Sequence, residues 1–172
     1  RTKMLKQVRP KIKMFFLTMD GFPMGCLSSA IEPLRVTNEI IGYELFEWNL
    51  VSEDQMPTKS SAKVSFDNDL DLEKISDGDF LFILSAPTSK FKNPGRANAT
   101  IRRLFQCGIA MGAFSGGIFP LAKSGIMEGI QCSVHWCYEH AFRSQFLNVR
   151  HSNSVIAIDR NRYTASGAGA VF

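Results

Sequence analysis

The sequence predicts a single α/β domain in which helices cover both faces of a mostly parallel sheet. The segment 79–86, DFLFILSA, is an almost uninterrupted apolar run, which is typical of a strand buried on both faces. Strand-like runs alternate along the chain with helix-like segments, the pattern of parallel α/β folds. With 172 residues, of which 45% are hydrophobic and 21% charged, the chain can form one domain with a substantial core.

The first half of the chain predicts two strands, a long helix and a hairpin. Residues 11–18 and 46–52 are apolar, strand-like runs that end at turn signals. Between them, apolar residues recur at helical spacing over residues 24–41, which predicts a helix. Pro33 lies inside this helix and is expected to kink it, because proline lacks an N–H donor. A polar turn at residues 53–57 and then a weak hairpin through Val64 and Phe66 are expected.

The second half continues the alternation of strands and helices. Asn93 is expected to cap a helix that stops at Gly108, and the apolar run 109–114 is expected to form a strand that leads into Ser115. Further elements are expected in chain order: a helix that ends at Gly125, a short strand at 132–136, a helix at 138–146, and a closing pair of strands at 155–159 and 162–166.

The first residues are basic. Six basic residues and no acid occupy the first 13 positions, although the net charge of the whole chain is only +4. A basic arm for nucleic acid is one interpretation, but no basic stripe continues into the rest of the sequence. Residues 1–10 are therefore expected to be a solvated, poorly ordered leader, and residues 11–172 a single domain.

Membrane insertion and disulfide bonding are not expected. The longest apolar-looking run, residues 108–122, is shorter than the roughly 20 residues that span a bilayer, and glycines and a serine interrupt it. No signal-peptide pattern opens the chain. The four cysteines form no C-x-x-C pair and are expected to be reduced thiols. These features predict a cytoplasmic protein.

The stretch GAFSGGIFPLAKSG, residues 112–125, places a serine among small residues between an expected strand and an expected helix. Ala113, Ser115 and Gly117 fit a relaxed G-x-S-x-G pattern, in which small residues permit a sharp strand-to-helix turn. Such a turn exposes the serine at the carboxyl end of a strand, where α/β sheets bind ligands. The N–H groups of Gly116 and Gly117 would point into the same space. A purely structural turn of small residues is the alternative.

Several motifs in the same order carry a resemblance to a known family. SGGIFPLAKSGIMEGIQCSVHW, residues 115–136, resembles the stretch around the nucleophile of PfpI-type proteins of the class I glutamine amidotransferase-like superfamily. AIEPLRVTN (30–38), FEWNLVSED (46–54) and YTASGAGA (163–170) resemble motifs of the N-terminal domain of GlxA-type regulators of the AraC family. The resemblance runs from about Lys13 to the end of the chain and implies a flavodoxin-like three-layer sandwich.

The sequence departs from this family at the positions that carry catalysis. Ser115 stands where hydrolytic members carry cysteine, Gly116 where peptidase-like members carry histidine, and Ser29 where the partner acid stands. Some members use a histidine near the position of His135. A serine needs a base and usually an orienting acid, and Asp20 is the only acid well placed by sequence. No enzymatic activity is therefore expected. The alternative is a PfpI-like hydrolase or hydratase that acts on a small molecule through Ser115 and His135.

The segment CSVHWCYEH offers Cys132, His135, Cys137 and His140 as zinc ligands. Four ligands within nine residues would have to converge across a strand-to-helix junction, whereas structural zinc sites usually join two separated pairs. Neither a metal site nor a cofactor is expected.

Two further features bear on a ligand site. Trp136, together with Trp48, could line an aromatic pocket for a cationic ligand, although large aromatic side chains more often belong to the core. Ala86 and Pro87 follow the strongest predicted strand, in a loop that faces the pocket in superfamily members.

The resemblance implies the ligand-sensing and dimerising domain of an AraC-family transcriptional regulator. The expected partners are a small polar metabolite of the amino-acid or quaternary-amine type, a second copy of the chain, and operator DNA. DNA would be bound through a helix-turn-helix domain expected beyond Phe172, and no membrane partner is expected. The expected ligand-binding residues are Ser115, Gly116, Gly117, His135, Trp136, Ala86 and Pro87.

Overall fold

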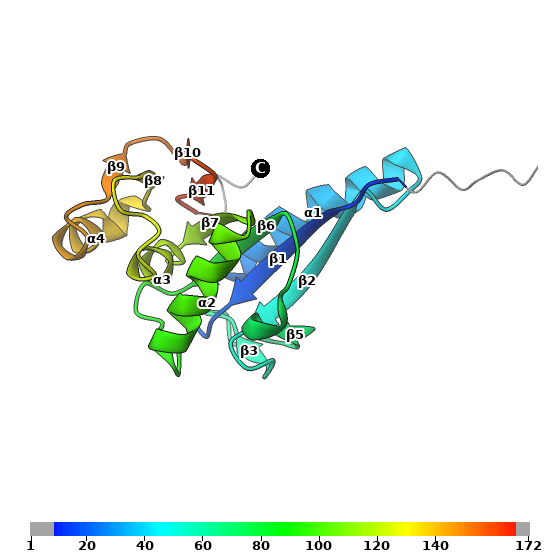
Figure 1. Cartoon of the computed structure of the whole chain (residues 1–172), viewed down its shortest axis with the longest axis horizontal. Helices are drawn as coiled ribbons and strands as arrows, with labels where there is room; N and C mark the ends of the chain where they lie inside the picture. Colours follow the sequence, from blue (N-terminus) through cyan, green and yellow to red (C-terminus); the bar gives the residue numbers. More distant parts are fainter. Residues whose placement is uncertain (1–8, 168–172) are drawn as a thin grey trace, which may run out of the picture.

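The computed structural model describes residues 9–167, in which a seven-stranded sheet has the order β10-β11-β7-β6-β1-β2-β5 (Figure 1). Every pairing in this sheet is parallel except that of β10 with β11. Without the two edge strands, the order is the 2-1-3-4-5 order of flavodoxin-like folds, as expected. The strands are β1 (Ile12–Thr18), β2 (Phe46–Ser52), β5 (Leu70–Asp71), β6 (Phe80–Ser85), β7 (Ala110–Ser115), β10 (Ile156–Asp159) and β11 (Arg162–Ala165).

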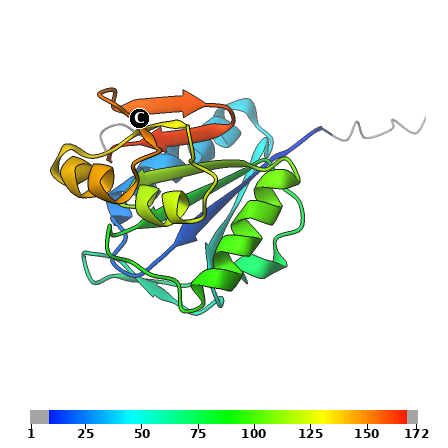
Figure 2. The same cartoon turned by 60° about the vertical axis from the view of Figure 1, so that its left-hand side comes forward.

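Helices cover both faces of the sheet (Figures 1 and 2). α1 (Met24–Ile41) lies on one face, whereas α2 (Pro94–Gln106) and α3 (Ile118–Lys123) lie on the other. Successive residues of β1 point to opposite faces, as a pleated strand requires. Phe16 belongs to the apolar cluster that includes side chains of α1, and Leu17 to the cluster that includes side chains of α2 and α3. The expected three-layer arrangement is confirmed.

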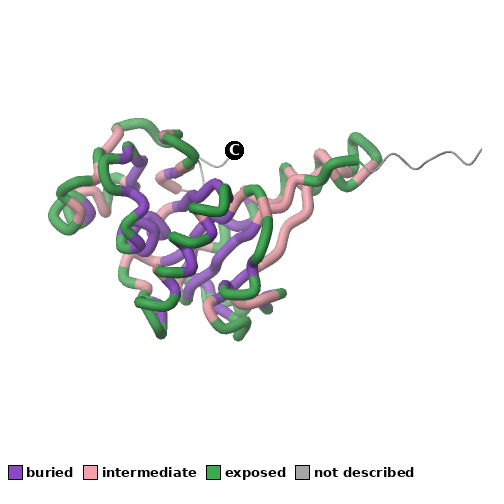
Figure 3. Tube along the Cα trace, viewed as in Figure 1, coloured by how far each residue is buried: buried purple, intermediate pink, exposed green. Residues whose placement is uncertain are grey.

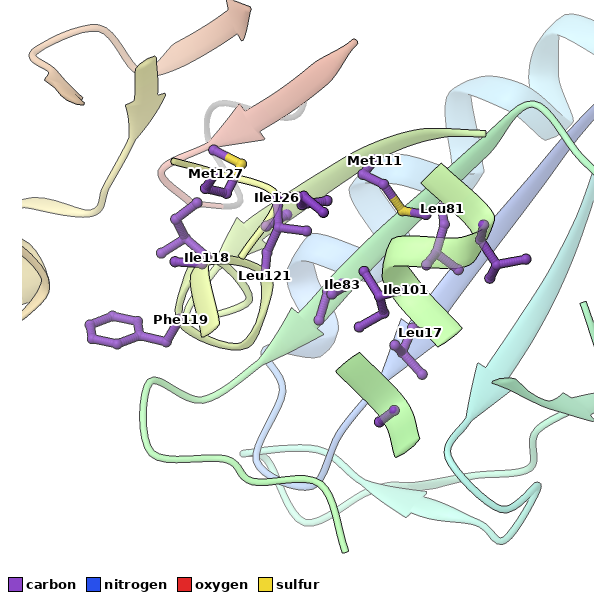
Figure 4. Packing of buried hydrophobic residues seen from close by; sticks show 14 of the residues in the cluster. Leu17, Leu81, Ile83, Ile101, Met111, Ile118, Phe119, Leu121, Ile126 and Met127 are labelled. Carbon is purple, nitrogen blue, oxygen red and sulfur yellow. The ribbon is translucent and has the colours of Figure 1, made fainter. Parts of the chain in front are cut away.

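The larger of the two apolar clusters lies between the sheet and the helices α2 and α3. Leu81 and Ile83 of β6 are fully buried in it, together with Ile101 of α2 and Leu121 of α3 (Figure 4). Burying a side chain of this size contributes about 1.5–3 kcal/mol. Burial is concentrated in the central strands, and the loops at the ends of the molecule are mostly exposed (Figure 3). The central strands therefore form a rigid base for the loops at their carboxyl ends.

The ends of the two long helices agree with the sequence signals. α1 ends at Gly42, whose φ of 73° is the left-handed conformation of a helix-terminating residue, and whose N–H donates to the Asn38 carbonyl. The helix continues through Pro33. The side chain of Asn93 accepts a hydrogen bond from the N–H of Arg96 and so caps α2, as predicted.

One expected strand is shorter than predicted and lies outside the main sheet. β8 (Gln131–Ser133) pairs in parallel with β9 (Arg150–Ser152), which the sequence did not predict. The Ser133 N–H donates to Oγ1 of Thr164 in β11 at 2.8 Å, which holds the small sheet against the main one. The chain then enters a 3₁₀ turn, so His135 begins a turn instead of ending a strand.

Some short elements differ from the expectation. β3 (Thr58–Lys59) and β4 (Ser65–Phe66) form the predicted hairpin. The two-residue strand β5 and the 3₁₀ helix η1 (Leu72–Lys74) had no clear sequence signal because both are short. α4 (Glu139–Gln145) is slightly shorter than the helix expected at 138–146.

One end of the molecule projects from the body. The C-terminal part of α1 and the first residues of β1 and β2 form this arm, which is mostly half-buried or exposed (Figures 1 and 3). Of the basic leader expected at 1–10, only Arg9 and Pro10 belong to the described residues. The guanidinium of Arg9 lies 4.4 Å from the centre of the Tyr43 ring on the arm. No helix within residues 9–167 is long and apolar enough to cross a membrane.

Candidate functional site

Ser115 lies at a sharp turn at the carboxyl end of β7. Its φ of 52° is left-handed, a conformation that costs a residue with a Cβ atom about 1–2 kcal/mol. Three residues later, at Ile118, α3 begins, so the strand, turn and helix have the geometry of a nucleophile elbow. The side chain is half-buried, and its hydroxyl has no hydrogen-bond partner among residues 9–167. The turn therefore presents a polar group that has no partner within residues 9–167 at the carboxyl end of β7.

The two glycines after Ser115 let the chain pack closely. A Cβ atom on Gly117 would lie 2.0 Å from the Ile83 carbonyl oxygen, and one on Gly116 would lie 2.5 Å from the Ser85 carbonyl oxygen. The Gly117 N–H donates to the Phe114 carbonyl at 3.0 Å. The expectation that both N–H groups are free for a ligand therefore does not hold for Gly117. Both glycines are buried, and the absence of their side chains allows α3 to pack against β6.

His135 lies over the end of β11, the strand beside β7. A Cβ atom on Gly167, which follows β11, would be 3.4 Å from Cδ2 of His135. The Nδ1 atom of His135 accepts a hydrogen bond from the backbone N–H of Cys137 at 3.3 Å. Because Nδ1 is an acceptor, the proton of the neutral ring resides on Nε2. The free side of the imidazole is thus a hydrogen-bond donor.

Within residues 9–167, no acid is placed to activate Ser115 or His135. Ser29, at the position of the family's acid, is buried in α1. Asp20 is exposed, and its Oδ1 accepts a hydrogen bond from the N–H of Lys59 at 2.8 Å. Among the residues described by the structure, no carboxylate hydrogen-bonds to His135, and no hydrogen bond joins His135 to Ser115. The arrangement can bind a polar group but lacks the groups that make a serine nucleophilic.

The loop after β6 forms the wall beside the elbow. The backbone of Ala86 and Pro87 lies 2.6 Å from the position that a Cβ atom on Gly116 would take. Gly21, in the loop after β1, approaches the same place, since its Cβ atom would lie 3.1 Å from Cβ of Ala86. The Ala86 N–H is held by the Ser89 hydroxyl at 3.0 Å. The structure therefore brings Ala86 and Pro87 beside the Ser115 turn.

The two tryptophans do not share a pocket. Trp136 is 81% exposed, so it does not belong to the core, and it borders a shallow surface hollow with His140 and Arg143. Trp48 lies in β2 and packs against the cluster on the α1 face. Trp136 begins the 3₁₀ turn after β8 and lies outside the main sheet. Of the two alternatives, the structure therefore supports packing against the core for Trp48, and it does not support one aromatic pocket lined by both side chains.

Zinc ligands do not converge either. Within residues 9–167, no three side chains of histidine, cysteine, aspartate or glutamate are placed to hold a metal ion. Cys132 is buried, and its burial raises the pKa of the thiol to about 12. Cys137 is exposed and lies next to His135, with 2.8 Å between Sγ and Nδ1.

A cavity of about 130 Å³ lies at the carboxyl ends of β1, β2 and β6, and the sequence analysis missed it. In the sheet, β1 lies between β2 and β6, so the chain order reverses at β1. This point is the topological switch point of the sheet, where α/β proteins commonly bind ligands. Asp20, Glu53 and Lys92 are among the residues that line it. Glu53 already accepts hydrogen bonds from the N–H groups of Lys92 and Asn93, at 2.6 and 2.7 Å. Asp20, two residues after β1, and Glu53, directly after β2, were the sequence signal that could have indicated this cavity.

Sequence comparison gives relatives that are regulators by name. No protein-family model matches the chain. The HTH-type transcriptional regulator GbdR of Pseudomonas aeruginosa is 31% identical over 156 residues, which cover 90% of this chain and 42% of GbdR. The HTH-type transcriptional regulator GlxA of Rhizobium meliloti is 28% identical over 144 residues, which cover 82% of this chain and 44% of GlxA. The chain thus spans less than half the length of these relatives.

Solved structures agree with the fold. The crystal structure of an AraC family transcriptional regulator from Pseudomonas putida superposes with a TM-score of 0.81 at 18% identity, over 93% of this chain and 86% of that one. A ThiJ/PfpI family protein from Pseudomonas syringae superposes with a TM-score of 0.76 at 16% identity, over 99% of this chain and 71% of that one. At these identities the likeness shows the fold, which is the one expected from the sequence.

Proposed function

We propose that this chain, a ThiJ/PfpI-like domain whose relatives are AraC-type transcriptional regulators, binds a small polar effector at the Ser115 elbow. The observation that carries the proposal is the half-buried Ser115 hydroxyl, which the left-handed turn presents at the sheet edge without a partner among the described residues. A half-buried hydroxyl without a partner contributes most to binding free energy when a ligand forms a hydrogen bond with it.

The chemistry of the elbow suits a ligand with a carboxylate or carbonyl oxygen. The Ser115 hydroxyl can donate or accept, and the Nε2–H of neutral His135 can donate. Neither group carries a fixed charge when the imidazole is neutral, so the polar contacts are directional hydrogen bonds. Ala86 and Pro87 supply a wall of small, half-buried residues beside the turn. These features support an effector that carries a carboxylate or carbonyl oxygen, as amino acids do.

The proposal includes transmission of binding to DNA through another part of the protein. The printed names of the relatives include "HTH-type", and more than half of the length of GbdR and of GlxA lies outside the match. We propose that a helix-turn-helix domain follows this one and that the chain acts as a homodimer. Exposed Val36, Ile40 and Ile41 at the end of α1 support an apolar dimer contact on the projecting arm.

A hydrolase or hydratase is the weaker proposal. Ser115 would need a base that takes its proton, and the nitrogen of His135 that is free in the described structure carries hydrogen in the neutral ring. Asp20 and Ser29 do not supply an orienting acid. The relatives named above are regulators, which agrees with the expectation of a non-enzymatic domain.

A ligand screen tests the proposal. The purified chain is melted with a panel of amino acids and carboxylate-bearing quaternary amines, because a ligand that binds the folded state alone raises Tm. For the best ligand, we expect Ser115→Ala to weaken binding by about 1 kcal/mol, roughly fivefold, by calorimetry. Ser28→Ala, at an exposed position of α1, is the matched control and should bind normally.

The cavity at the switch point is the alternative binding position for the effector. Asp20→Asn changes a residue that lines this cavity and leaves the elbow intact. If Asp20→Asn abolishes binding and Ser115→Ala has no effect, the effector occupies the cavity, and the elbow is a structural turn.

A further inference from the structure

The four cysteines of this chain differ sharply in their environments. Cys26 and Cys132 are buried, which raises the pKa of their thiols to about 11 and about 12. Cys107 and Cys137 are exposed. Since the thiolate is the nucleophilic form, the two buried thiols are unreactive near neutral pH, and the exposed pair decides the thiol chemistry of the folded domain.

Only one of the two exposed thiols has a base beside it among the described residues. Sγ of Cys137 lies 2.8 Å from Nδ1 of His135, which is within hydrogen-bond distance. The backbone N–H of Cys137 donates to the same nitrogen, so Nδ1 carries a lone pair in the neutral ring. Cys107 follows the last turn of α2, where the carbonyl ends of the helix disfavour a negative charge.

We infer that Cys137 is a nucleophilic thiol, activated by His135, at which soft carbon electrophiles such as α,β-unsaturated carbonyl compounds become covalently attached. A cysteine and an imidazole within hydrogen-bond reach form the pair that generates thiolate in proteins. The site shares His135 with the proposed effector site but uses its Nδ1 atom, and the inference does not depend on the proposed effector.

The reaction balances with the groups present. Nδ1 of His135 takes the thiol proton, which leaves a thiolate beside an imidazolium. The thiolate sulfur forms a bond to the β-carbon of the electrophile, and the electrons of its C=C bond move onto the α-carbon and carbonyl oxygen. The α-carbon then takes a proton from the imidazolium, which becomes neutral again. No oxidant, reductant or leaving group is needed.

The surroundings of Cys137 favour a flat, unsaturated reagent. The ring of Trp136 is 81% exposed and lies 5.6 Å from the His135 ring, centre to centre. The Tyr138 ring lies 5.5 Å from the same imidazole. These two aromatic rings near the activating histidine offer stacking surface for a conjugated carbonyl compound. This surface distinguishes Cys137 from a thiol on a purely polar loop.

The test uses acrylamide, an α,β-unsaturated amide that reacts slowly with ordinary thiols. The folded chain and N-acetylcysteine are treated at pH 7, and peptide mass spectrometry gives a rate for each cysteine. We expect Cys137 to react about tenfold faster than N-acetylcysteine and Cys107, with no reaction at Cys26 or Cys132. Equal rates for Cys137 and N-acetylcysteine would overturn the inference.

The His135→Asn variant tests whether the imidazole activates the Cys137 thiol, because asparagine removes the basic nitrogen. We expect the Cys137 rate to fall to within about threefold of N-acetylcysteine, whereas Cys107→Ser, the matched control, leaves it unchanged. A rate at Cys137 that stays fast in His135→Asn contradicts the role of His135. Protection of Cys26 and Cys132 reports that the variant is folded. If they become reactive, the comparison in the unaltered chain decides the inference.

Discussion

The backbone N–H of Cys137 donates to Nδ1 of His135 at 3.3 Å, and this contact determines what the imidazole can offer at the edge of the sheet. With Nδ1 occupied as an acceptor, the neutral ring holds its proton on Nε2. In serine hydrolases the roles are reversed, because an acid accepts from Nδ1–H and the opposite nitrogen is the base. The fold therefore retains the elbow turn while the histidine has the wrong tautomer for activating Ser115.

We predict that Ser115 does not react with a fluorophosphonate probe. An unactivated serine hydroxyl is a weak nucleophile, and the described structure provides neither a free basic nitrogen nor an orienting acid. After incubation at pH 8, intact mass spectrometry is expected to show no adduct, and a serine protease treated in parallel should be fully labelled. A stoichiometric adduct on Ser115 would revive the hydrolase proposal.

Much of the fold could be predicted because its signals are local. The apolar run at β6, the helical spacing of α1 and the cap at Asn93 each depend on a few neighbouring residues, and the structure contains all three. β9 and η1 were missed because each has only three residues and depends on contacts with distant parts of the chain. The N–H of Arg150 in β9, for example, donates to the carbonyl of Ile130, 20 positions earlier in the chain, at 2.9 Å.

The candidate site was less predictable for the same reason. The elbow at Ser115 follows from small residues in one short stretch, and its left-handed φ agrees with that pattern. The roles of Gly116 and Gly117 could not be deduced, because the carbonyl groups that crowd them belong to β6. Sequence spacing also could not show that Trp48 packs against the apolar cluster on the α1 face whereas Trp136 is exposed.

We predict that Gly117→Ala strongly destabilises the domain. The new Cβ atom would lie 2.0 Å from the Ile83 carbonyl oxygen, and a backbone atom cannot move aside cheaply. The expected loss in urea unfolding is about 3 kcal/mol or more, comparable to severe overpacking of a core.

The matched control is Gly95→Ala in α2, where the nearest atom to a new Cβ is Oδ1 of Asn93 at 3.9 Å. Alanine is the better helix former there, so stability should rise by about 0.5–1 kcal/mol. Similar stabilities for Gly117→Ala and the unaltered chain would show that α3 does not pack as closely on β6 as described.

We predict that the domain loses stability at alkaline pH because two of its thiols are buried. Burial raises the pKa of Cys26 to about 11 and that of Cys132 to about 12, from the ordinary value of 9.0. The folded state therefore holds these protons more tightly than the unfolded state does. The contribution of these two protonated thiols to the free energy of unfolding is complete below pH 9, and it is lost as the pH rises towards 11 and 12.

Urea unfolding at pH 8 and at pH 10.5 measures this loss. We expect the unfolding midpoint to fall over this interval, and to fall less in Cys132→Ala, which lacks one of the two thiols. Cys107→Ser removes an exposed thiol and is expected to keep the full dependence. An identical alkaline decrease in Cys132→Ala would mean that other groups cause it.

We predict that the chain forms dimers at micromolar concentration and that the arm contributes to the contact. Ile40 is 79% exposed in the last turn of α1, beside exposed Ile41 and Val36. Water contact of such side chains is unfavourable by about 25 cal/mol per Å² of apolar surface, which an interface would recover. Sedimentation velocity of the chain should show the dimer, and Ile40→Lys should shift it to monomer.

Leu147→Lys provides the matched control for this charge. Leu147 is 84% exposed and follows α4, at the end of the molecule opposite to the arm in Figure 1. Both variants add one positive charge to an exposed position, so both should keep the Tm of the unaltered chain, because neither side chain packs in the core. The argument for the arm requires that only Ile40→Lys dissociates the dimer. Dissociation by Leu147→Lys alone would move the contact to the α4 end, and a monomer in every sample would remove dimerisation from the proposed function.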